Sequence, residues 1–262
     1  MAKVAVKREK RGDYIKFLGT SGARFVMIKQ LRASGGIWIS YKGTNVLIDP
    51  GPGSIVRMAQ SKPKLDPSKL DAIILTHRHL DHSGDINVMI EAMTEGGFKK
   101  KGLVFCPEDS IKEDTVILKH VMGFPEKIVL LKANTDYQAG NFKFTTSMRH
   151  IHPVETYGIK FRLNKTNLAL ISDTRYFERL KDFYRADALI LNLVFFEPRP
   201  EIDHLNFSDA AMLISKIKPK KAILTHFGMN MLKAKPRIQA EGLAKKFGVE
   251  VVAAYDGMKL EF

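Results

Sequence analysis

Residues 76–82 read Thr76-His77-Arg78-His79-Leu80-Asp81-His82 and place three histidines and an aspartate within six consecutive positions. They follow the apolar run Asp71-Ala72-Ile73-Ile74-Leu75, which is typical of a strand. Clustered imidazoles beside a carboxylate are costly to fold unless a bound cation compensates for their crowding. Divalent transition metals bind both kinds of side chain. The stretch therefore predicts a metal site at the end of a strand.

Other polar residues also follow apolar, strand-like runs. They are Asp49 after 46–48, His150 and His152 after the run ending at Thr146, Asp173 after 168–171, and His226 after 222–224. A single aspartate at such a position is more often a turn or helix cap than a ligand. Strand ends along one rim of a sheet converge, however, so their number and shared placement favour one common site.

Short apolar runs separated by Gly-, Ser- and Pro-containing turns predict many strands. The predicted strands are 14–18, 37–41, 46–48, 72–75, 103–106, 127–131, 142–146, 157–163, 168–171, 188–191, 222–224 and 249–252. The predicted helices are 82–93, 111–122, 209–216 and 236–247. This mixture predicts two sheets with helices packed outside, in one domain over 1–262 with a polar lead-in at 1–12.

The chain has 262 residues, of which 45% are apolar, so it can bury a full core. No apolar run approaches the ~18 residues that span a membrane, and the charged N-terminus does not resemble a secretory signal. We therefore expect a soluble cytoplasmic protein that does not bind membranes. The lone cysteine, Cys106, rules out an internal disulfide and is expected to be a buried small side chain.

The formal net charge is +14. The basic residues fall in small groups at 7–11, 99–101, 216–221, 233–237 and 245–246. Any one group can be a solvated surface, but the total excess favours anionic partners such as phosphate esters, nucleotides or nucleic acid.

The 76–82 stretch matches the His-x-His-x-Asp-His signature of the metallo-β-lactamase superfamily, and the resemblance covers about residues 14–260. Phe17-Leu18-Gly19-Thr20-Ser21-Gly22 resembles the opening of the ribonuclease Z branch. Further similar segments are Leu47–Gly51, His152–Gly158, Ser172-Asp173-Thr174 and Leu224–Phe227. The resemblance implies an α/β fold, the four-layer αββα sandwich, and a hydrolase with two divalent metal ions. Zn²⁺ is the expected ion, with Mn²⁺ and Fe²⁺ as alternatives.

Carried over residue by residue, the resemblance implies two sets of ligands joined by one bridging carboxylate. His77, His79 and His152 would hold the first ion, Asp81, His82 and His226 the second, and Asp173 would bridge them. His150 lies near the third-ligand position and is the alternative to His152. Asp49 would accept a hydrogen bond from a ligand histidine and so fix its tautomer.

The segment Asp203-His204 resembles the mobile histidine motif of phosphodiesterase members. We expect His204 to be catalytic, by contacting a nonbridging phosphate oxygen or protonating the leaving oxygen. Asp81 is the second catalytic candidate, because it supports occupancy by two ions. His120, with no ligand beside it in the sequence, is expected to be an ordinary helix or surface histidine.

The resemblance therefore implies attack by a metal-bridging hydroxide on a small or cyclic phosphodiester, an anionic small-molecule substrate. The alternatives are a ribonuclease Z-like tRNA 3′ endonuclease with RNA as substrate, a thioesterase or lactonase, and a metal-bearing nucleic-acid-binding module. Residues 98–150 lack the long Gly/Pro-rich arm with which ribonuclease Z clamps tRNA. A homodimer is a further expectation, with Met89, Met93 or Phe98 at its interface.

Overall fold

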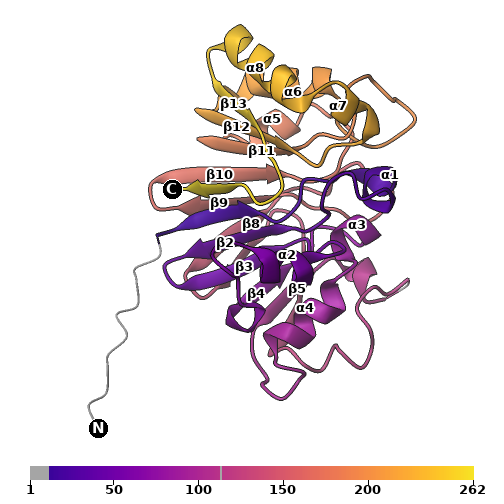
Figure 1. The fold of residues 1–262 in the computed structure, drawn as a ribbon, viewed down its shortest axis with the longest axis vertical. Helices are drawn as coiled ribbons and strands as arrows, with labels where there is room; N and C mark the ends of the chain where they lie inside the picture. The colour runs from indigo at the N-terminus through magenta and orange to yellow at the C-terminus, as the bar shows by residue number, and fades with distance from the viewer. Residues whose placement is uncertain (1–11, 113) are drawn as a thin grey trace.

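Two seven-stranded sheets lie face to face in the computed structural model, which describes residues 12–112 and 114–262 (Figure 1). The first sheet contains, in order, β14 (Lys259–Glu261), β1 (Tyr14–Phe17), β2 (Ile37–Tyr41), β3 (Thr44–Ile48), β4 (Ala72–Ile74), β5 (Leu103–Cys106) and β6 (Lys127–Leu130). The second contains, in order, β13 (Glu250–Ala253), β12 (Lys221–Thr225), β11 (Ala188–Asn192), β10 (Thr166–Ile171), β9 (Ile159–Leu163), β8 (Phe142–Thr146) and β7 (Asp136–Ala139).

Helices cover the outer faces of both sheets, as Figure 1 shows. Between the strands of the first sheet, the chain forms α1 (Ala23–Ile28), α2 (Ser54–Gln60), α3 (Leu80–Ser83), α4 (Ile86–Met93) and the short 3-10 helices η1 (Pro67–Lys69) and η2 (Glu108–Ser110). The second carries α5 (Leu180–Phe183), α6 (Phe207–Ile217), α7 (Met229–Lys233) and α8 (Pro236–Phe247). This arrangement confirms the predicted four-layer αββα sandwich.

Successive side chains of a strand point to opposite faces of its sheet, and the apolar ones form three layers. Phe17, Ile39 and Phe142 belong to the core between the two sheets, where both inner faces are apolar. Leu213 of α6 packs in a second core on the outer face of the second sheet, and Met89 of α4 in a third on the first sheet. The central parallel strands are therefore buried on both faces, which explains their nearly continuous apolar sequences.

The parallel strands end at one edge, and this edge carries the polar residues singled out above. β3, β4, β5 and β6 pair in parallel in one sheet, and β10, β11, β12 and β13 do so in the other. β8 is antiparallel to β9, which is antiparallel to β10, so β8 ends at the same edge. The loops after β3, β4, β8, β10 and β12 consequently meet there.

One helix prediction is wrong, and a second is confirmed only in part. Residues 111–112 and 114–122 form turns after η2 rather than a helix. The Asn87 side chain donates to the Val116 carbonyl (2.9 Å) and accepts from the Leu118 N–H (2.8 Å), groups that a helix would bond internally. The predicted helix over 82–93 is divided into α3 and α4 near Asp85, whose carboxylate accepts from the Ile55 N–H (3.1 Å).

Several short helices and strands were not predicted from the sequence. α1, α2, α5, α7, β7 and β14 were not predicted, because elements of three to seven residues give little periodicity.

Met89 and Met93 are fully buried and cannot form a dimer interface, whereas Phe98 is exposed. Cys106 is buried as expected. The basic group at 7–11 lies outside the described residues. Within the described ranges, no helix has the length and apolar character needed to cross a membrane.

Close backbone packing at Gly36 gives a stability prediction. A Cβ there would lie 1.9 Å from the Ile48 carbonyl oxygen and 2.3 Å from that of Asp49, so a side chain would push apart the ends of β2 and β3. Gly36→Ala should lower the free energy of unfolding by about 2–3 kcal/mol, measured by urea denaturation. Gly242→Ala in α8 is the control, since its Cβ meets nothing within 4 Å; helix propensity predicts a gain of about 0.5–1 kcal/mol. Equal stability of the two variants would contradict the packing argument.

Candidate metal centre

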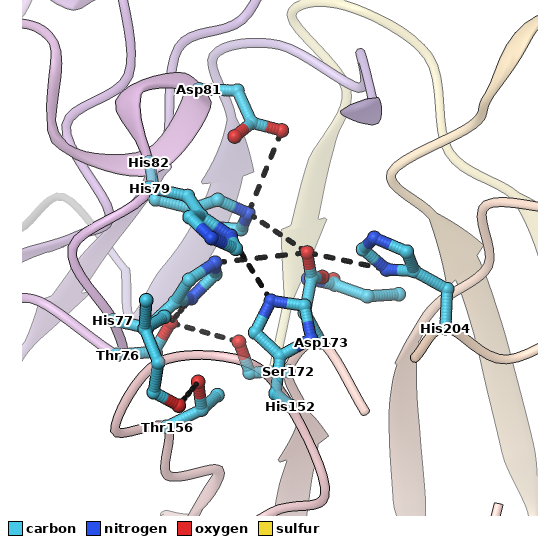
Figure 2. A network of polar contacts seen from close by, with 12 residues as sticks. Thr76, His77, His79, Asp81, His82, His152, Thr156, Ser172, Asp173 and His204 are labelled. Carbon is cyan, nitrogen blue, oxygen red and sulfur yellow. Dashed lines mark hydrogen bonds and ion pairs between the residues drawn. The ribbon is translucent and has the colours of Figure 1, made fainter. Parts of the chain in front are cut away.

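Eight of the predicted residues meet at the shared edge of the two sheets. Figure 2 shows Asp173 between the loop that carries the 77–82 residues and His204, with His152 beside them. Possible ligand atoms gather in four overlapping groups, within each of which all atoms lie within 4.8 Å of one another. The groups are His77–His79–His152, His77–His82–Asp173, Asp81–His82–His226 and His152–Asp173–His204.

Asp173 is the centre of the cluster. Its Oδ2 atom lies 3.4 Å from Nε2 of both His82 and His226, 3.5 Å from Nδ1 of His204 and 3.7 Å from Nε2 of His77. Its other oxygen accepts a hydrogen bond from Asn192 Nδ2 (2.8 Å), which fixes the carboxylate. Asn192 ends β11, between the strands that lead to Asp173 and His226. It was not predicted; its place at the end of an apolar strand was the available signal.

Hydrogen bonds on the outside of the cluster fix the tautomers of three histidines. His82 Nδ1 donates to Asp49 Oδ2 (2.9 Å), and His152 Nδ1 donates to the Asp203 carbonyl (2.9 Å). The Thr76 hydroxyl donates its one proton to Asp49 (2.8 Å) and can therefore only accept from His77 Nδ1 (3.1 Å). In the neutral rings, the Nε2 lone pairs of all three histidines point into the cluster. Asp49 thus makes the contact expected of it.

The inward nitrogens lie close to other imidazole nitrogens. His82 Nε2 lies 3.3 Å from His226 Nε2, and His152 Nε2 lies 3.0 Å from His79 Nδ1. His77 Nε2 and His204 Nδ1 are buried and have no hydrogen-bond partner within the described residues. Buried nitrogen lone pairs beside a carboxylate are costly unless a cation lies among them. The donor set therefore fits divalent metal ions held by imidazole and carboxylate.

The protonation tendencies reflect the same concentration of charge. Burial lowers the pKa of His77 well below its ordinary value, and neighbouring histidines lower it further. Burial alone would lower the pKa of His82, but the carboxylates of Asp173, Asp81 and Asp49 outweigh it and raise that pKa well above its ordinary value. Burial would raise the pKa of Asp173, yet the surrounding imidazoles hold it well below its usual range. The site thus favours an ionised carboxylate next to positive charge.

The backbone turns sharply at two residues of the site, Asp49 and His226. Asp49 and His226 adopt left-handed backbone conformations, with φ of 52° and 60°, directly after β3 and β12. Such a conformation is uncommon for residues other than glycine and is maintained by the surrounding packing. Part of that packing is Gly22, where a Cβ would lie 2.1 Å from the His226 carbonyl oxygen. The segment that leads into α1 therefore supports the His226 turn.

The structure separates the two candidates for the third ligand position. His152 points into the cluster, whereas the ring of His150 is bonded elsewhere. His150 Nδ1 donates to the Asp173 backbone carbonyl (3.1 Å), and its Nε2 accepts from the Tyr184 hydroxyl. Burial lowers the pKa of His150 to about 4 and keeps the ring neutral. His120 is exposed on the 111–122 segment.

Comparisons with known proteins agree with the fold. A family profile described as the beta-lactamase superfamily domain matches residues 44–227, which include every member of the cluster. An uncharacterized protein of Methanocaldococcus jannaschii is 32% identical over 257 residues, 94% of both chains. Ribonuclease Z of Thermococcus kodakarensis is 40% identical over 77 residues, which are 29% of this chain and 23% of that protein. The crystal structure of YhfI from Bacillus subtilis, a metallo-beta-lactamase fold protein, superposes with a TM-score of 0.76 at 21% identity, covering 96% of this chain and all of that one.

The buried Tyr184–His150–Asp173 chain of hydrogen bonds gives a second stability prediction. Tyr184→Phe removes the hydroxyl that donates to His150 and leaves a buried nitrogen unsatisfied. The free energy of unfolding should fall by about 1–3 kcal/mol in a denaturant titration. Tyr255→Phe is the matched control, because the Tyr255 ring is largely exposed, and should leave stability unchanged. An unchanged Tyr184→Phe protein would show that the hydrogen bond has no net stabilising effect.

Proposed function

The chain belongs to the metallo-β-lactamase superfamily, and from this premise we propose that it is a metal-dependent phosphodiesterase acting on a small or cyclic phosphodiester. The observation that carries the proposal is the crowding of four imidazole nitrogens within 3.4–3.7 Å of Asp173 Oδ2. One bridging carboxylate among several neutral imidazoles is a ligand set for two divalent ions.

In the proposed centre, each ion has its own side-chain ligands and both share Asp173. His77, His79 and His152 would hold one ion, and Asp81, His82 and His226 the other. Zn²⁺ is the first candidate, with Mn²⁺ and Fe²⁺ as alternatives that the same donors accept. Such ions lower the pKa of water and stabilise negative charge on an ester oxygen, so they would supply the nucleophile and the electrophilic assistance.

The chain's own residues would orient this chemistry. Asp49 and the Asp203 carbonyl hold His82 and His152 with Nε2 inward, so few ligand rotamers have to be ordered when ions bind. The Ala23 N–H donates to Asp81 Oδ2 (3.1 Å), which fixes that carboxylate toward His226. His204 approaches Asp173 from a separate loop. It would donate a hydrogen bond to a phosphoryl oxygen or a proton to the leaving oxygen.

Two observations favour a phosphodiester over a thioester or lactone. The net charge of +14 raises the local concentration of anions. The ribonuclease Z of Thermococcus kodakarensis, similar over 77 residues, is by its name an enzyme that cleaves RNA. We prefer a small ester to a precursor tRNA because residues 98–112 and 114–150 form β5, η2, β6, β7, β8 and the connections between them. These ranges contain no Gly/Pro-rich arm that could clamp a folded RNA.

Metal-depleted protein should not hydrolyse bis(p-nitrophenyl) phosphate, and Zn²⁺ or Mn²⁺ should restore turnover with about two ions per chain. At a free metal concentration 100 times its dissociation constant, stability should rise by about 2.7 kcal/mol. Asp173→Asn should lower both ion content, by mass spectrometry, and turnover. Asp182→Asn, an exposed carboxylate on α5, is the control. Full ion content in Asp173→Asn would contradict the bridging role.

A precursor tRNA assayed beside the small ester separates the two phosphodiester hypotheses. We expect metal-dependent turnover of the ester and little cleavage of the RNA. Efficient 3′ cleavage of the RNA with poor ester turnover would instead support the ribonuclease Z-like function.

His204→Ala should lower kcat on bis(p-nitrophenyl) phosphate by about 10²–10⁴-fold, the usual contribution of a positioned proton donor. Ion content should stay at the wild-type value, because the two sets of ligands are complete without His204. His120→Ala is the matched control, since that ring is exposed on the 111–122 segment. A fall in ion content would show that His204 is a ligand, and unchanged turnover would remove it from the catalytic machinery.

A further inference from the structure

Exposed apolar side chains lie on the segments that carry the metal-centre residues. Phe25 on α1 is 61% exposed, Leu80 at the start of α3 is 65% exposed, Ile151 is 43% exposed and Ile202 is 40% exposed. Together with the half-buried Phe195, these residues are called the apolar rim. Each is close in sequence or in space to a residue of the candidate metal centre.

One side of the rim belongs to α1 and α3. The backbone N–H of Ala23, two residues before Phe25, donates to Asp81 Oδ2 (3.1 Å). α1 packs against α3, and the two helices lie near each other on one side of the molecule (Figure 1). Leu80 stands between His79 and Asp81 in the sequence. Phe25 and Leu80 therefore border the part of the site that contains Asp81 and His226.

The other side of the rim comes from the loops around His152 and His204. The Ile151 carbonyl accepts from the Arg175 N–H (2.9 Å), which ties it to the segment after Asp173. The Ile202 carbonyl accepts from the His204 N–H (2.8 Å). The Phe195 ring meets the His204 ring edge to face, with centroids 5.9 Å apart. These three side chains therefore border the part of the site that contains His152 and His204.

Cationic side chains are present on the same segments. Arg24 lies next to Phe25, and Arg149 lies two residues before Ile151; both are exposed. Large apolar side chains grouped on a surface mark a binding region, whereas isolated ones are ordinary. A surface that combines cations, proposed metal ions and apolar side chains is complementary to an anion with an apolar substituent. It is poorly suited to a ligand that is polar throughout.

We propose that the substrate of this centre is an amphiphilic phosphodiester, in which an aryl or alkyl group next to the phosphoryl centre packs on the apolar rim. This inference rests on the proposed phosphodiesterase function and narrows its substrate class. Contact with the rim would remove apolar surface of both partners from water and would orient the ester relative to His204.

Two non-hydrolysable ligands of equal charge test the inference by binding. Monomethyl phenylphosphonate and monomethyl methylphosphonate are titrated calorimetrically into Zn²⁺-loaded protein. The phenyl ligand should bind at least about tenfold more tightly, the lower range for one apolar group in a binding site. In a Leu80→Ser/Ile151→Ser double variant, the ratio of the two dissociation constants should fall toward one. Ile238→Ser, an exposed position on α8, should keep the wild-type ratio.

Equal affinities in the wild-type protein, or no binding of either phosphonate, would overturn the inference. Light scattering adds another decisive outcome, because a dimer dissociated by the Leu80→Ser change would show that a second copy covers the rim. Turnover of bis(p-nitrophenyl) phosphate keeps this failure distinct from that of the proposed function. If the protein hydrolyses bis(p-nitrophenyl) phosphate but binds the two phosphonates equally well, only the amphiphilic substrate class is overturned. If the protein prefers the phenyl ligand but does not hydrolyse the ester, the proposed phosphodiesterase reaction is overturned, and the apolar rim is supported as the ligand-binding surface.

Discussion

The rest of the structure depends on the burial of one carboxylate oxygen, Asp173 Oδ2, among four imidazole nitrogens. Outward hydrogen bonds leave Nε2 of His77, His82 and His152 on the inside of the cluster, so proximity alone does not stabilise the arrangement. The raised pKa of His82 shows that this environment favours a positive charge. A cluster of this kind persists because the fold holds its members in place, and divalent ions are the charge that best matches it.

The sandwich provides that rigidity through the parallel strands. β10, β11 and β12 are buried on both faces, and Asp173, Asn192 and His226 lie at or just past their ends. The second sheet contributes three of the proposed ligands, whereas the 77–82 residues come from the first, so the cluster forms only when both sheets pack correctly. The left-handed turns at Asp49 and His226 are stabilised by the same packing. Core stability and site geometry are therefore coupled in this chain.

Sequence patterns predicted the parts of the site that local chemistry determines. The density of ligands at 77–82 and the strand-end positions of Asp49, Asp173 and His226 were visible because each follows an apolar run. Asn192, Tyr184 and the Ala23 N–H were missed, because their roles depend on contacts between residues 19 to 58 positions apart. The helix predicted over 111–122 failed for a similar reason. The apolar spacing there was genuine, since Ile117 and Val121 are buried, but Asn87 from another element competes for the backbone groups.

The same local geometry connects the metal centre to the apolar rim. In the stretch His79-Leu80-Asp81, the two flanking side chains point into the cluster, which leaves Leu80 on the outside at the border of the site. Ile151 likewise stands next to an inward histidine, His152, while the His150 ring on its other side bonds Tyr184. Polar residues at such positions would have served solubility equally well. The loops that carry the proposed ligands thus determine where the neighbouring side chains lie. Because those side chains are apolar, the surface suits an amphiphilic ester better than a small anion.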